Sequence, residues 1–133
     1  MKTVAVFALL FLVVSSLPGC RVKPSKVITF HGPSPEVFYT VEVWEDSGAM
    51  SSDFTRVFAH FEHNHKSDKV MFLDGAYLIV GDVRWNGKND ATVCLSGGRV
   101  NSFNESISLR AGGSTYDIRN RVDQNCPNYR PLL

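Results

Sequence analysis

The 133-residue chain lacks several features on which enzymes and nucleic-acid-binding proteins depend. No serine stands in a Gly-x-Ser-x-Gly motif and no glycine-rich loop opens a helical pattern, so neither a hydrolase nucleophile nor a phosphate cradle is indicated. The 14 basic and 13 acidic side chains almost cancel, which argues against the positive field that steers nucleic-acid binding. We therefore predict a non-enzymatic protein that needs no cofactor and binds no nucleic acid.

The chain also lacks an apolar run long enough to span a membrane permanently. Residues 4–14 (VAVFALLFLVV) form an apolar block of 11 residues, whereas a spanning helix needs about 20. Lys2 precedes this block, and serines, a proline and a glycine follow it, which is the layout of a secretory signal. We predict that residues 1–19 are removed on export, and this removal takes away only one charge, that of Lys2.

The residues behind the apolar block allow two cleavage sites. Cleavage after Ser16 would release a soluble secreted or periplasmic protein. The segment LPGC, however, resembles a bacterial lipobox, in which Leu17, Gly19 and Cys20 match the pattern. That resemblance implies a lipid on Cys20 that anchors the protein to a membrane. In lipoproteins of this kind the residue after the cysteine directs sorting, so the resemblance also implies that Arg21, in place of Asp, directs the protein to the outer membrane.

Cysteine is scarce, with three residues in the whole chain. An odd number in an exported protein leaves one thiol unexplained. If Cys20 is acylated, Cys94 and Cys126 remain and can form a disulfide in an oxidising compartment. Cys94 alternates within TVCLS and could instead be a buried strand thiol, but Cys126 lies in the polar segment DQNCPNYR. We therefore favour the pair.

Prolines divide the exported part of the chain into two regions. Three of the six prolines fall in residues 20–36, which we predict to be a tether with at most one short strand, KVITF. Residues 37–133 are predicted to form one domain. Its first segment, VFYTVEVWED, alternates with period two, as a strand does. One face would carry Val37, Tyr39, Val41 and Val43, and the other Phe38, Thr40, Glu42 and Trp44.

Turn signals recur between short apolar runs in the rest of the chain. Asp74-Gly75, between VMFL and AYLIVG, predicts a two-residue hairpin turn, because such dipeptides tolerate positive φ angles. Asn86-Gly87, Gly97-Gly98 and Gly112-Gly113 repeat the signal. Regular turns between short strands are typical of a β-sandwich or barrel. We predict an all-β fold, a single antiparallel β-sandwich of the Ig-like kind.

Residues 52–63 fit two patterns. Phe54, Val57, Phe58 and Phe61 have helical spacing behind a possible Ser-Ser-Asp cap. The same segment also alternates with period two and is rich in phenylalanine, which favours a strand. We predict a strand that continues through a hairpin into VMFL.

The order of the segments FTRVFAHFEHN, VMFLDGAYLIVG and GRVNSFNESISL resembles that of small Ig-like β-sandwich domains in uncharacterised bacterial envelope lipoproteins. The resemblance rests on the order of strands and turns. It implies a fold and no particular activity, because folds of this type host many functions.

Three of the four histidines lie in HFEHNH, at His60, His63 and His65. Imidazole is a common ligand of zinc and copper, so these residues are candidate metal ligands. On a strand, however, His60 and Glu62 would share one face and His63 and His65 the other, which leaves a two-ligand site. A solvated hairpin loop is the simpler interpretation.

Together these features predict a non-enzymatic envelope lipoprotein whose domain is a binding or accessory module for another envelope protein. The alternative is a periplasmic metal-binding protein that uses HFEHNH.

The intact mass of the exported protein tests the prediction for Cys20. We expect acylation of Cys20 and a rise of about two mass units when one disulfide is reduced. An unmodified chain beginning near Leu17 would contradict the lipid anchor.

Overall fold

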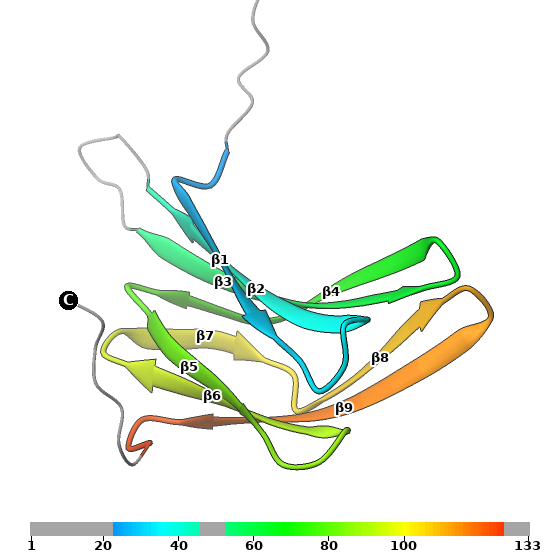
Figure 1. The fold of residues 1–133 in the computed structure, drawn as a ribbon. Coiled ribbons are helices and arrows are strands. Elements are labelled where there is room, and N and C mark those ends of the chain that lie inside the picture. The colour runs from blue at the N-terminus through cyan, green and yellow to red at the C-terminus, as the bar shows by residue number, and fades with distance from the viewer. Residues whose placement is uncertain (1–22, 46–52, 127–133) are drawn as a thin grey trace, which may run out of the picture.

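The computed structural model describes residues 23–45 and 53–126, which form nine strands in two packed sheets (Figure 1). The strands are β1 (Lys26–His31), β2 (Val37–Trp44), β3 (Phe54–His63), β4 (Lys66–Ala76), β5 (Ile79–Trp85), β6 (Asp90–Ser96), β7 (Arg99–Phe103), β8 (Ser106–Ala111) and β9 (Ser114–Asp123). This confirms the predicted all-β sandwich. The predicted signal segment and Cys20 lie outside the described residues. The described residues contain no helix that is long and apolar enough to cross a membrane.

Sheet A has the strand order β1-β2-β3-β4-β7, and sheet B has the order β5-β6-β9-β8. All neighbouring strands are antiparallel except β6 and β9, which run parallel from Asp90 opposite Arg119 to Cys94 opposite Asp123. The sandwich is therefore mixed rather than purely antiparallel. The chain passes from one sheet to the other after β4, β6 and β7, so each sheet contains segments that are distant in the sequence.

Two expected strands are present. Residues Phe54–His63 form β3, which confirms the choice of strand over helix for the described part of residues 52–63. The short strand expected at KVITF is present as β1, so sheet A begins inside the segment predicted to be a tether. The turn from β3 to β4 consists of Asn64 and His65, whose φ angles are 47° and 59°. Positive φ angles at both positions suit a tight hairpin turn.

The hairpin predicted at Asp74-Gly75 is wrong. Both residues lie inside β4, where the pairing with β7 shifts register between them. A Cβ atom on Gly75 would come within 2.3 Å of the backbone oxygen of Arg99 and of Leu78 Cδ1. The glycine therefore permits a close approach at a bulge, which is its other common role in strands. The chain leaves sheet A later, at Tyr77 and Leu78, and β5 joins sheet B.

Other turn signals are confirmed. Gly87 has a φ of 79° in the connection between β5 and β6. Gly112 and Gly113 form the two-residue turn between β8 and β9, with φ angles of 56° and 79°. The tip of this hairpin touches the β3–β4 turn, since Asn64 Nδ2 donates to the Gly112 carbonyl at 3.4 Å. Figure 1 shows both hairpins extending in the same direction, one from each sheet.

The core lies between the sheets and is built from alternate residues of each strand, as period-two patterning requires. Its largest fully buried apolar side chains are Tyr39, Phe72, Leu73, Leu109, Ile118, Val37, Val41, Val57 and Val93. Tyr39 on β2 packs against Phe72 of β4 and Trp85 of β5, with ring centroids 4.9 and 5.2 Å apart. Tyr39 therefore joins the two sheets.

One polar contact crosses this core. The Tyr39 hydroxyl donates to Asn120 Oδ1 on β9, and both side chains are fully buried. Burial raises the pKa of Tyr39 far above its ordinary value, so the hydroxyl stays protonated and remains a donor. Asn120 Nδ2 and Trp85 Nε1 have no hydrogen-bond partner among the described residues. The Tyr39 hydroxyl is thus the side-chain hydrogen-bond donor that satisfies the buried amide oxygen of Asn120.

We expect Tyr39→Phe to lower the free energy of unfolding by about 1–3 kcal/mol, because it leaves Asn120 buried without a side-chain partner. Adding Asn120→Leu should recover most of that loss, since an apolar pair needs no hydrogen bond. Urea denaturation of the two single variants and the double variant gives the coupling energy. Strict additivity of the two changes would contradict the contact.

Candidate binding face on the outer side of sheet A

The outer side of sheet A carries an unusual number of aromatic side chains. The inward positions of β2 and β3 include Tyr39 and Val57, so alternation sends the intervening residues outward. The register then sets Phe38 opposite His60, Thr40 opposite Phe58, and Trp44 opposite Phe54. We call the following set the aromatic face: Phe38, Trp44, Phe54, Phe58, His60, Arg56 and Lys69.

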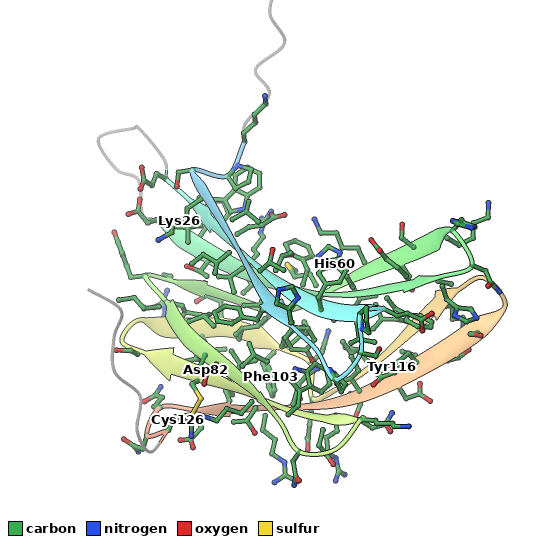
Figure 2. The ribbon with its side chains drawn as sticks, viewed as in Figure 1. Lys26, His60, Asp82, Phe103, Tyr116 and Cys126 are labelled. Carbon is green, nitrogen blue, oxygen red and sulfur yellow. A yellow bond between two sulfur atoms is a disulfide. The ribbon has the colours of Figure 1, made fainter. Side chains whose placement is uncertain are left out.

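At one end of this face Phe38 and His60 stack, with ring centroids 4.5 Å apart and planes only 8° apart. His60 Nε2 lies 2.7 Å from the Thr40 hydroxyl, close enough for a hydrogen bond. Burial, and then the charge of Lys69, lower the pKa of His60 below its ordinary value, although Glu62 and Glu42 oppose the shift. His60 is therefore a neutral ring at neutral pH. Figure 2 labels it on sheet A.

In the centre of the face a lysine covers a phenylalanine. Lys69 Nζ lies 4.0 Å from the centroid of Phe58, within the range of a cation–π contact. The same ammonium group lies 2.9 Å from Glu42 Oε1, and Trp44 Nε1 donates to the other oxygen of Glu42 at 3.2 Å. The Glu42 side chain is 13% exposed. This carboxylate therefore links Lys69 in the centre of the face to Trp44.

At the other end Trp44 and Phe54 stack with centroids 5.7 Å apart and planes 7° apart. The guanidinium of Arg56 lies 4.8 Å from the Phe54 centroid and 5.7 Å from that of Trp44. Arg56 Nε is also 3.9 Å from Asp74 Oδ1, a loose ion pair. Each cation of the face thus has both an aromatic and an acidic neighbour.

The rings of the aromatic face are partly shielded by their neighbours. His60 and Phe38 cover each other, Trp44 and Phe54 cover each other, and Lys69 covers Phe58. What remains is a broad sheet surface with ring atoms and paired charges. Such a surface suits a partner of comparable breadth.

The candidate histidines do not converge. His60 belongs to the aromatic face, whereas His63 lies at the end of β3 with Nδ1 2.9 Å from Glu36 Oε1. His65 lies beyond the strand, in the turn, so His63 and His65 do not share a strand face. In residues 23–45 and 53–126 no group of three or more His, Cys, Asp or Glu side chains could hold a metal ion.

The cysteine pair predicted from the sequence is confirmed. Cys94 on β6 and Cys126 beyond the end of β9 form a disulfide, with Cα atoms 5.8 Å apart. Cys94 is 2% exposed. The bond ties the end of β9 to the parallel neighbour strand on the side of sheet B that faces away from the core. Figure 2 shows Cys126 in this position. It lies in the other sheet from the aromatic face.

Sequence reasoning missed the aromatic face, although its members were visible. Alternation placed Phe38 and Trp44 on one face of their strand and Tyr39 on the other. It did not show which of the two faces lay inside. The missing information was the register between β2 and β3, which brings the outward aromatic residues of the two strands together. A signal was present, since Phe54 and Phe58 are spaced for the same side of a strand.

Comparison of the chain with protein-family models, with curated proteins and with solved structures found no match.

We expect His60 to make stability depend on pH. Its pKa is lower in the folded protein than the ordinary value of 6.5. The unfolded chain therefore takes up this proton first as pH falls, and the folded state loses stability below about pH 6.5. Between about pH 7 and pH 5 the free energy of unfolding should fall less in His60→Gln than in the wild type. Equal pH dependence in both proteins would contradict the assignment.

Proposed function

We propose that the protein is a non-enzymatic binding or accessory module for another protein of the cell envelope, and that the aromatic face is its contact surface. The observation that carries this proposal is the row of aromatic side chains on the solvent side of sheet A. A sandwich needs apolar residues between its sheets, and large aromatic residues on the opposite side have no role in that core.

The composition of the face supports a protein partner. Tryptophan, phenylalanine, arginine and methionine are enriched at protein interfaces, whereas lysine and glutamate are depleted. Met71 lies opposite Phe58 and is 39% exposed, and Val27 lies opposite Glu42 and is 53% exposed. These two side chains extend the apolar surface across β1 and β4.

The charges of the face favour a partner that is not strongly charged. Lys69 is paired with Glu42, and Arg56 with Asp74. The face therefore carries little net charge to steer a distant ion or polyanion, and its affinity would come from apolar contact. The paired groups would instead fix the orientation of the partner at short range.

The proposed anchor would hold this face near the membrane. Residues 21–25 separate Cys20 from the start of β1, and a fully extended segment of that length covers about 15–20 Å. With Cys20 acylated, the domain would stand close to the lipid surface. Sheet A would follow the anchor directly, because β1 is its first strand. A partner in the same membrane would then be within reach.

A photo-crosslinking amino acid placed at Met71 tests the contact surface. In cells that produce the protein, we expect this position to yield one specific adduct with another protein. The same amino acid at Ser108, an exposed position on β8 of sheet B, is the matched control. Adding Phe58→Asp to the protein that carries the crosslinking amino acid in place of Met71 should reduce the adduct about ten-fold or more. The substitution places a charge in the centre of the face.

The proposal is wrong if Met71 and Ser108 give the same adducts, or if Phe58→Asp leaves the adduct unchanged while the variant remains folded by circular dichroism.

A further inference from the structure

Four strands form the edges of the two sheets, and three of them show protective features. In β8 the Arg110 backbone N–H donates to Asp68 Oδ2 at 2.8 Å, so this edge group has a partner. The ladder of β5 is interrupted by a register shift between Val80 and Asp82. The ladder of β7 is short and shifts where it meets Asp74 and Gly75. Bulges, short strands and capped groups all hinder pairing with another chain.

The fourth edge, β1, has none of these features. It pairs with β2 over all six residues without a register shift. Its sequence, KVITFH, contains no proline or glycine and is rich in residues that favour strands. Its charged residue, Lys26, stands at the very start of the strand. Natural sheets seldom leave such a regular edge uncovered, since it is a template for further pairing.

The backbone groups that β1 leaves unpaired can be assigned. The Gly32 N–H donates to the Val37 carbonyl at 2.8 Å, so these two residues form a hydrogen-bonded pair. Hydrogen-bonded and non-bonded pairs alternate along an antiparallel ladder, so Ile28 and Phe30 also direct their backbone groups toward β2. Val27, Thr29 and His31 therefore direct theirs away from it. No described strand pairs with that side of β1.

We propose that this edge joins two copies of the chain, with β1 of one copy antiparallel to β1 of the other and Thr29 opposite Thr29. In this register the outward N–H and C=O groups of Val27 pair with those of His31 in the other copy. Thr29 pairs with Thr29 of the other copy. A two-fold axis through the Thr29 pair relates the copies, as in most homodimers.

The side chains of β1 complement themselves in this arrangement, which is why a second copy is the occupant. Ile28 would lie opposite Phe30 on the inner side, an aromatic and β-branched pair of the kind that stabilises sheets. Both residues are only partly buried in one copy and already pack against its core. Lys26 would lie opposite Gly32, and His31 opposite Val27, so no like charges meet.

The inference does not depend on the proposed function, but it would change how that function operates. The two copies of sheet A, each five-stranded, would become one continuous sheet. Outward side chains of β1 stay on the same side across a hydrogen-bonded pair, so both aromatic faces would look in one direction. The dimer would then present two equivalent contact surfaces to a membrane-bound partner, which raises avidity without any new contact.

Cysteine cross-linking of the full exported chain tests the edge. Across a hydrogen-bonded antiparallel pair the Cα atoms lie about 5.5 Å apart, so Thr29→Cys should react efficiently with bis-maleimidoethane to give a covalent dimer. Thr115→Cys, at an exposed position of β9 in sheet B, is the matched control. The wild type measures any background from Cys20.

We expect about ten-fold more covalent dimer from Thr29→Cys than from either control at micromolar concentration. A yield that matches the Thr115→Cys control would overturn the proposal.

A proline substitution in β1 distinguishes cross-linking through edge pairing from cross-linking after random collisions. Val27 directs its N–H away from β2, so Val27→Pro should preserve the ladder within one copy and remove a donor between copies. In the Thr29→Cys background we expect this change to lower the dimer yield about ten-fold, with the melting temperature almost unchanged. Undiminished cross-linking in the folded double variant would show that the copies do not meet through β1, and would refute the proposal.

Discussion

The structure depends on the burial of one face of each sheet against the other. Tyr39, Leu73, Leu109 and Ile118 are all almost completely inaccessible between the sheets, and burial of each such side chain stabilises the fold by about 1.5–3 kcal/mol. Because side chains alternate, this requirement also decides which residues cannot be inside. The position of Tyr39 in the core directs Phe38 and Thr40 toward the outer side of sheet A, and the same rule applies along β3.

The aromatic face is a consequence of alternation along β2 and β3. Its side chains take no part in the core between the sheets. Its rings reduce their exposure by packing against each other and against Lys69 and Arg56. Packing of this kind shields part of the apolar surface of the rings and leaves the rest accessible. The paired charges around Glu42 hold the side chains in one arrangement, so little conformational entropy would be lost when a partner binds.

Local patterns predicted local structure well. Alternation in residues 52–63 correctly indicated a strand despite the helical spacing of its phenylalanines, and Gly112-Gly113 correctly indicated a hairpin. The polar surroundings of Cys126 pointed to its bond with Cys94. Asp74-Gly75 misled because the dipeptide suits a tight turn and a glycine bulge equally, and only the approach of Arg99 from β7 distinguishes them.

Nonlocal pairing was beyond the reach of these patterns. The parallel contact of β6 with β9 joins segments that no turn connects, and the rows of the aromatic face require the register of β2 against β3. The histidines illustrate the same limit, since His60 acquires its role from Phe38 and Thr40 on a neighbouring strand and not from His63 or His65.

The central claim is that the aromatic face is covered by a partner where the protein works. Hydroxyl-radical footprinting measures this directly, by comparing side-chain oxidation in intact cells with oxidation of the purified protein. Met71 lies beside the aromatic face, opposite Phe58, and Tyr77, which is 58% exposed, lies away from it in the connection between β4 and β5. The account predicts that Met71 is protected in cells and Tyr77 is not. Equal oxidation of Met71 in cells and in the purified protein would contradict it.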